Sequence, residues 1–164
     1  MNDVTKISWA EVLNNGDFIC VETFSGLGMM GRDPQGARHF LPSNVSDEIF
    51  GAAVLDALAQ SRILTLGEAG IFFDLELGKQ RYAQWVADLM ARYGYKTKRS
   101  VFKNMKRCSV ERKNGTIIIR PSHHEKLEAW SGDGISKEDY VTLSADSSTV
   151  EVGAALRLAF SRCT

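Results

Sequence analysis

The chain has 164 residues, of which 44% are hydrophobic and 24% are charged, and its formal net charge is zero. This length predicts a single domain over residues 1–164 that buries a core without the help of disulfides or metal ions. No apolar run approaches the roughly 20 residues that a membrane-spanning helix needs, which excludes that class of protein. The first residues carry no basic flank followed by an apolar stretch, so no secretory signal is expected and we place the protein in the cytoplasm.

The zero net charge hides one strongly basic block. Residues 92–126 carry eleven basic and two acidic side chains, a balance of +9, whereas the balances are −2 over 1–42, −4 over 43–91 and −3 over 127–164. The three cysteines, Cys20, Cys108 and Cys163, form no CxxC pair. This spacing indicates neither a disulfide framework nor a zinc site, and buried thiols are the expected role.

The first third of the chain predicts a short helix followed by a strand meander. Ser8 and Glu11 have the spacing of a capping box, which predicts a helix that stops at Asn15-Gly16. Residues 17–24 are rich in β-branched and aromatic side chains and predict a strand. Short strands over 29–32 and 38–41 are expected to follow it.

The middle of the chain predicts two helices with a strand between them. Ser46 is a candidate N-cap for a helix that runs to about Gln60. The apolar run over residues 71–75 predicts a strand. From Tyr82 to Tyr93 apolar side chains recur at helical spacing, and Gly94 is expected to end that helix.

The last third mixes both kinds of element. We expect a short basic helix over 99–106, and Asn114-Gly115 predicts a hairpin between strands 108–113 and 116–120. A helix is expected to start at Ser122 and reach about Trp130. After a strand over 139–143, the capping box of Ser148 and Glu151 opens a final helix. The predicted class is therefore α+β, with a largely antiparallel β-sheet and packed α-helices.

One short run of residues has metal-ligand character. His123-His124-Glu125 resembles the start of a helical zinc motif, but Glu128 stands where the second histidine of H-E-x-x-H belongs. A helix start is therefore favoured, and a metal-dependent hydrolase at these residues is kept as an alternative. The chain contains neither a nucleophile elbow nor a glycine-rich phosphate loop. With no catalytic set, cofactor motif or metal site, the sequence predicts a binding protein and not an enzyme.

The basic block of residues 92–126 supports a second alternative, a nucleic-acid-binding module. Its lysines and arginines are dense enough to bind phosphates, and Tyr93, Tyr95 and Phe102 lie among them. Against this, Tyr93 and Phe102 are needed on buried helix faces. A solvated basic face that balances acidic neighbours is the favoured interpretation.

Several strings of residues resemble one known family. They resemble the CdiI immunity proteins of bacterial contact-dependent growth inhibition, and they lie at residues 40–42, 51–55, 93–99, 102–106, 124–132 and 151–163. The resemblance extends over nearly the whole chain and is strongest from residue 93 onward.

The resemblance implies a function and a partner. Such proteins stay in the cytoplasm and neutralise the C-terminal toxin domain of a CdiA effector delivered by a neighbouring cell. In the subgroup that this chain resembles, the toxin is a zinc-dependent DNase, and a toxin β-hairpin enters a pocket of the immunity protein and extends its sheet. The resemblance also implies that the chain performs no chemistry of its own and binds neither nucleic acid nor membranes.

Charge and strand patterns predict where the toxin would bind. A nuclease is basic where it contacts phosphate, so its inhibitor is expected to offer carboxylates there. The acidic stretches are residues 68–76 and 133–139, and the first contains the predicted strand 71–75. We therefore predict a binding site formed by Glu68, Phe72, Phe73, Asp74 and Asp133. Phe72 and Phe73 have an alternative role as core residues.

Overall fold

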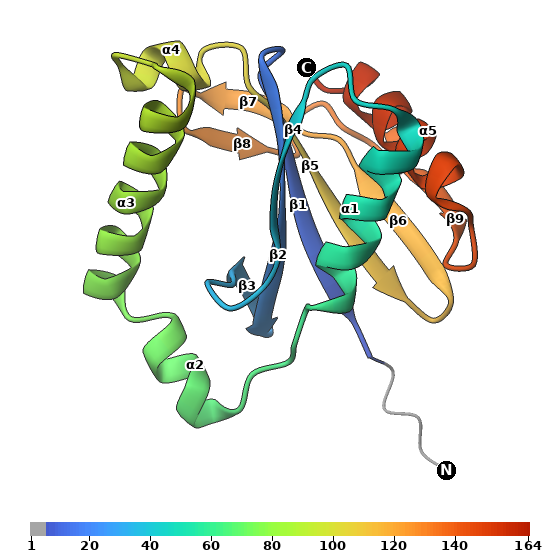
Figure 1. The fold of residues 1–164 in the computed structure, drawn as a ribbon. Coiled ribbons are helices and arrows are strands. Elements are labelled where there is room, and N and C mark those ends of the chain that lie inside the picture. The colour runs from blue at the N-terminus through green and yellow to red at the C-terminus, as the bar shows by residue number, and fades with distance from the viewer. Residues whose placement is uncertain (1–5) are drawn as a thin grey trace.

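The strands form one large antiparallel sheet in which two short strands share an edge. The computed structural model describes residues 6–164. β3 (Met29–Arg32) and β4 (Arg38–Pro42) both pair with β2 (Phe18–Leu27), on the side away from β1. The sheet continues through β1 (Ser8–Asn14), β5 (Lys106–Lys113), β6 (Thr116–Arg120) and β9 (Val141–Ser144). Helices lie on both of its faces (Figure 1), so the predicted α+β class with a largely antiparallel sheet is confirmed.

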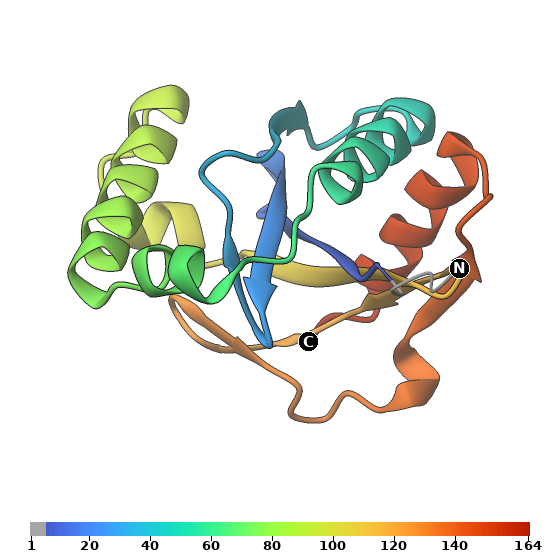
Figure 2. The ribbon, with the colours of Figure 1, turned by 90° about the horizontal axis from the view of Figure 1, so that it is seen from below.

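Two helices that are far apart in sequence cover one face of the sheet. α1 (Asp47–Ala59) and α5 (Thr149–Ser161) lie side by side there (Figure 2). Both begin as predicted, because Ser46 and Ser148 accept hydrogen bonds from the first-turn amides. The core beneath them contains fully buried side chains from four neighbouring strands, including Val12, Ile19, Val110 and Ile117.

The opposite face of the sheet is covered by α3 (Leu75–Tyr93) and α4 (Lys98–Phe102). Trp85, Leu89 and Phe102 from these helices pack on Phe18 and Cys20 of β2. α3 ends at Gly94 in the left-handed conformation, with φ 70°, as the sequence predicts. α4 is shorter than predicted, because the chain leaves it after Phe102 and buries Met105 in the same core.

The Asn114-Gly115 turn also forms as predicted. Asn114 has φ 52° and Gly115 has φ 72°, and they join β5 to β6 in a tight hairpin. The strand expected at 139–143 begins slightly later, at Val141, after a turn of 3₁₀ helix over Lys137–Asp139.

The helix predicted from Ser8 and Glu11 is wrong, because these residues lie in β1. This strand pairs with β2 on one side and β5 on the other, so it lies in the interior of the sheet. Alternate residues such as Ala10 and Val12 are buried beneath α1 and α5. Burial with a period of two therefore overrides the local capping pattern.

The strand predicted over residues 71–75 is also wrong. This segment ends α2 (Leu66–Phe72) and begins α3. Thr65 and Glu68 form a capping box at the start of α2, and Asp74 accepts a hydrogen bond from Leu77 N as the N-cap of α3. The two caps satisfy free helical amides, which an apolar run alone does not reveal.

The helix predicted from Ser122 to Trp130 is replaced by a two-stranded hairpin, β7 (His123–Lys126) and β8 (Ala129–Ser131). His124 stacks on its cross-strand partner Trp130 with ring centroids 4.9 Å apart, and its backbone N–H donates to Thr164 O. These contacts with a strand partner and with the end of the chain favour the extended form. Within residues 6–164, no helix is long and apolar enough to cross a membrane.

The crossing of α1 and α5 gives a test of the fold. A Cβ atom added at Gly51 would lie 1.8 Å from Thr149 O, and one at Gly153 would lie 2.0 Å from Asp47 O. Gly51→Ala and Gly153→Ala must force the helices apart, and we expect each to lower the free energy of unfolding by roughly 1–3 kcal/mol in urea titrations.

Gly78 in α3 provides the matched control. A Cβ atom there would meet nothing within 4 Å, so Gly78→Ala should raise stability by about 0.5–1 kcal/mol through helix propensity alone. Equal effects at Gly51 and Gly78 would contradict the close crossing.

Candidate functional site

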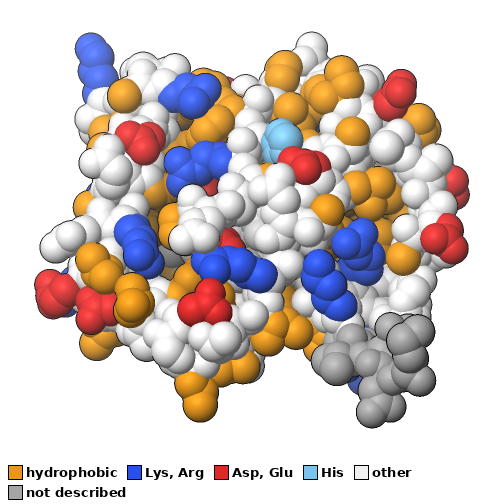
Figure 3. All heavy atoms as spheres, turned by 60° about the horizontal axis from the view of Figure 1, so that its bottom comes forward, with side chains coloured by type: hydrophobic (Ala, Val, Ile, Leu, Met, Phe, Trp, Pro, Cys, Tyr) orange, Lys and Arg blue, Asp and Glu red, His pale blue; other side chains and the backbone are white. Residues whose placement is uncertain are grey.

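A pocket of about 390 Å³ opens between the β3–β4 edge of the sheet and α3. Aromatic side chains and arginines dominate its lining: Arg32, Arg38, Phe72, Arg81, Tyr82 and Trp85. Figure 3 shows several Lys and Arg side chains on one face of the molecule, with hydrophobic side chains between them. The pocket combines an apolar wall with cationic groups, so it is suited to an amphipathic segment of a partner.

The base of the pocket is organised by one buried carboxylate, that of Glu22 on β2. Its side chain is only 4% exposed. Glu22 Oε2 lies 2.9 Å from Arg32 Nε and 3.1 Å from Arg38 Nε, while Oε1 accepts a hydrogen bond of 3.0 Å from Trp85 Nε1. The Arg32 guanidinium also lies over the Trp85 ring, 3.8 Å from its centroid. One carboxylate thus ties both edge strands to α3.

A second carboxylate lies directly beside Glu22 in the sheet register. Glu11 of β1 is the cross-strand partner of Glu22, and its Oε2 lies 3.1 Å from Arg107 Nε. Burial raises the pKa of Glu11 to about 7, although Arg107 and Arg32 oppose that rise. Glu11 and Arg107 line a smaller pocket of about 180 Å³ that shares Tyr82 and Trp85 with the larger one.

The outer edge of β3 and β4 carries free backbone groups. Gly26 N–H donates to Arg62 O, and Gly26 O accepts from Leu64 N–H, so both backbone groups of Gly26 point to the β1 side of β2. Thr23 forms its backbone hydrogen bonds on the opposite, β3–β4 side. By strand alternation, Met30 and Arg32 then direct their N–H and C=O groups outward, away from β2. Within residues 6–164, no strand pairs with this edge.

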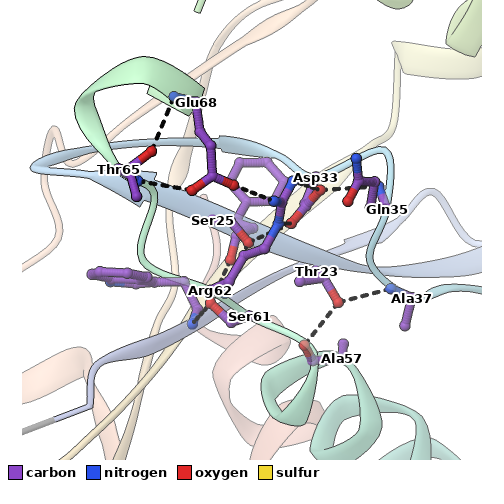
Figure 4. Close-up of polar contacts among 12 residues, drawn as sticks. Thr23, Ser25, Asp33, Gln35, Ala37, Ala57, Ser61, Arg62, Thr65 and Glu68 are labelled. Atoms are coloured by element: carbon purple, nitrogen blue, oxygen red, sulfur yellow. Dashed lines mark hydrogen bonds and ion pairs between the residues drawn. The ribbon is translucent and has the colours of Figure 1, made fainter. Parts of the chain in front are cut away.

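A buried network fixes the turn between the two edge strands (Figure 4). Asp33 accepts hydrogen bonds from Ser25 Oγ at 2.7 Å and from Arg62 Nε at 2.7 Å, and Arg62 Nη1 also contacts Glu68 Oε2 at 3.0 Å. Burial raises the pKa of Asp33, but the hydrogen bonds from Arg62, Ser25 and Gln35 N–H outweigh it and hold the pKa below its usual value. The network therefore ties the turn between β3 and β4 to α2 through Arg62 and Glu68.

Four of the five predicted binding residues lie beside this pocket or next to it in the chain. Phe72 lines it, and a Cβ atom at Gly31 of β3 would lie 3.0 Å from Phe72 and 3.2 Å from Phe73. Glu68 and Phe72 share an adjoining pocket of about 180 Å³. Asp74 is exposed and caps α3 immediately after these phenylalanines.

The fifth predicted residue, Asp133, lies elsewhere. It is exposed in the loop after β8, where its N–H donates to Ser131 Oγ. Ser131 Oγ in turn donates to Glu125. The structure therefore joins Asp133 to the β7–β8 hairpin and does not bring it to the pocket beside α2.

The residues behind the two alternative functions have structural partners. His123 Nδ1 lies 2.9 Å from Thr164 Oγ1, and His124 Nε2 lies 2.9 Å from Leu127 O. In the described part of the chain, no group of three or more His, Cys, Asp or Glu residues is placed to hold a metal ion. In the basic block, Arg107 pairs with Glu11 and Arg120 with Glu111, so part of its charge is neutralised within the fold.

Comparisons with known proteins place this fold in a family. The family model described as CdiI, CDI immunity protein, matches residues 8–163. The chain belongs to the CdiI family of CDI immunity proteins. It is 47% identical to the immunity protein CdiI-YPIII of Yersinia pseudotuberculosis, over 99% of both chains.

Two solved structures share the fold. One is the CdiA-CT/CdiI toxin and immunity complex from Yersinia pseudotuberculosis, with a TM-score of 0.90 and 44% identity over 97% of this chain and 98% of that one. The other is a protein of unknown function from Neisseria meningitidis, with a TM-score of 0.91 and 42% identity over 97% and 96%. The family resemblance read from the sequence is therefore confirmed. These comparisons leave the zinc-dependent DNase subgroup untested.

Sequence reasoning missed the charged base of the pocket. Glu22 alternates with Cys20 and so faces the same side of β2, and Trp85 lies on the predicted buried face of its helix. That pattern places Glu22 on an apolar face, which a carboxylate occupies only with partners. The pattern does not identify Arg32 and Arg38 as those partners.

Removing the Glu22 charge tests its role in this CdiI fold. Glu22→Gln keeps the shape of the side chain but leaves Arg32 and Arg38 without their counter-ion. We expect the free energy of unfolding to fall by about 2–3 kcal/mol, which is below the 3–5 kcal/mol typical of a fully buried pair because both arginines reach solvent. Glu76→Gln is the control, since Glu76 is exposed and, within residues 6–164, pairs only with Lys79, and it should change stability by less than about 0.5 kcal/mol. Equal losses for the two variants would contradict the assigned role.

Proposed function

We propose that this chain binds the C-terminal toxin domain of a cognate CdiA effector in the cytoplasm and neutralises it by occlusion. The toxin is a nuclease, of the zinc-dependent DNase class, and the chain contributes no catalysis and contacts neither nucleic acid nor membrane. The family assignment supports the immunity role, and the similar Yersinia chain was solved in a complex of toxin and immunity protein.

The observation that carries the mode of binding is the free edge of β3 beside the pocket. Met30 and Arg32 present outward N–H and C=O groups, and Phe72, Tyr82 and Trp85 wall the adjoining space. A toxin β-hairpin that pairs with this edge extends the sheet, and its side chains fill the pocket. Main-chain hydrogen bonds then supply affinity and the pocket supplies specificity.

The acidic residues predicted from the sequence complete the proposed contact surface. Glu68 and Asp74 flank Phe72 and Phe73 in the chain and are exposed at the start of α2 and α3. Asp133 offers a further carboxylate on the β7–β8 side. We propose that these three carboxylates face basic parts of the nuclease around the docked hairpin, with Phe72 and Phe73 shaping the pocket.

A proline at Met30 tests strand addition directly. Met30→Pro removes one outward N–H while leaving the hydrogen bonds of β3 to β2 intact. We expect the affinity for the purified cognate CdiA toxin domain to fall at least about tenfold, because the proline removes a main-chain bond and obstructs the incoming strand. Calorimetric titration measures this change.

Met30→Ala is the matched control, because it removes the side chain and keeps the N–H. It should bind more tightly than Met30→Pro, and thermal unfolding must show both variants folded. Equal binding by the two variants would rule out strand addition at this edge. Failure of the unmodified chain to bind the toxin, or to stop its zinc-dependent cleavage of DNA, would overturn the proposed function itself.

Charge reversal tests the three acidic positions. Asp133→Lys is the clearest variant, since Asp133 has no capping role, whereas Asp74→Lys also removes a helix N-cap at a cost of about 1 kcal/mol. Glu68→Lys likewise removes both an ion pair and a capping contact. For an exposed rim position we expect slower association at low salt and a loss of about 1 kcal/mol or less in binding. If all three variants associate like the unmodified chain, these residues lie outside the interface.

A further inference from the structure

The groove between α3 and the β3–β4 edge carries more cations than carboxylates. Arg32 and Arg38 share the single carboxylate of Glu22. Arg81 has no carboxylate within 4 Å among the described residues and contacts only Phe72 O, at 3.4 Å. Arg92 lies over the Phe40 ring at 3.9 Å.

Fewer carboxylates than guanidinium groups lie at this groove. Asp88 is the one carboxylate among the residues that line the pocket, and it accepts a hydrogen bond of 2.8 Å from Gln84. Three guanidinium groups, those of Arg32, Arg38 and Arg81, line the same pocket, so with the paired carboxylate of Glu22 included the cations still outnumber the carboxylates. The groove has a net positive charge, although the whole chain is neutral and the surrounding segment 43–91 is acidic.

The positions of these cations match an extended strand. Arg81 and Arg92 are eleven residues apart on α3, which corresponds to roughly 16 Å along the helix axis. That length equals about five residues of β-strand. Alternate side chains of a strand paired with the outer edge of β3 and β4 would point toward α3.

We propose that the groove selects an acidic strand of the partner toxin, in which one α3-facing carboxylate pairs with Arg81 and a second lies at the Arg38–Arg92 end of the groove. This inference rests on the proposed function and names the chemistry of the segment that the pocket accepts. The apolar side chains of the strand pack on Phe72, Tyr82 and Trp85. The guanidinium groups that stack on aromatic rings are already oriented before the strand binds. Ion pairing with them therefore costs little additional side-chain conformational entropy.

Arg81 is the residue to change, because it forms no ion pair in the described part of the chain. Lys79 is its matched control on the same helix: it is 76% exposed, pairs among the described residues only with Glu76, and lines neither of the two pockets that Arg81 lines. Arg81→Glu and Lys79→Glu change the net charge by the same amount. Association of each with a catalytically inactive toxin domain is measured by stopped flow in dilute salt and in 1 M NaCl.

We expect Arg81→Glu to weaken toxin binding about tenfold in dilute salt, and Lys79→Glu to weaken it less than about threefold. In 1 M NaCl the difference should shrink, because the screening length falls to about 3 Å. A charge exchange completes the test: replacing each Asp or Glu of the docked toxin strand by Lys should identify one position that restores binding to Arg81→Glu.

Three results would overturn this inference. Equal effects of Arg81→Glu and Lys79→Glu, or no restoring position on the toxin, would show that the groove does not select a carboxylate. Self-association of the unmodified chain that Arg81→Glu abolishes in sedimentation would identify a second copy as the occupant. The proposed function stands in the first two cases if the unmodified chain binds and inhibits the toxin and Met30→Pro binds it at least about tenfold more weakly. It fails if the unmodified chain does not bind the toxin or does not stop its cleavage of DNA.

Discussion

The buried carboxylate of Glu22 is the interaction on which the pocket depends. It receives Arg32 from β3, Arg38 from β4 and the indole N–H of Trp85 from α3. A charge removed from water is stable only when its partners satisfy it. The need to satisfy this carboxylate therefore fixes the distance between the sheet edge and the helix, and with it the width of the groove.

The two faces of the sheet are built on different principles. The face beneath α1 and α5 is apolar and closely packed, and its helices meet at Gly51 and Gly153 with no room for a side chain. The face beneath α3 combines aromatic packing with ion pairs around Glu22 and Glu11. We interpret the first face as the source of stability and the second as the recognition surface.

Free edge strands are a hazard for most proteins, because they pair with other chains. Here the edge formed by β3 and β4 is short, is interrupted by the Asp33 turn and carries arginines. These features restrict pairing to a strand of complementary charge and length. In the proposed binding mode the same free groups serve specific binding, so the features that limit aggregation would also select the partner strand.

The sequence by itself determined the elements whose signals are local, and the strings of residues that mark the family. The caps at Ser46 and Ser148, the Asn114-Gly115 turn and the Gly94 stop act on nearby backbone groups, and the tertiary structure retains each of them. Of the predicted site, Phe72 and Phe73 lie at the pocket, but in a helix and the loop after it and not in a strand.

Only the tertiary structure decided the rest. β1 and β7 carry helix-start patterns, yet β1 pairs with β2 and with the distant β5. β7 pairs with β8, and its His124 N–H donates to Thr164 O at the far end of the chain. Glu22 and Trp85 are 63 residues apart, and no local pattern indicates that they meet. The cluster around Glu22 is drawn from four elements, β2, β3, β4 and α3, and so depends on how those elements pack. The sequence therefore revealed the family and most of the framework, while the base of the pocket required the fold.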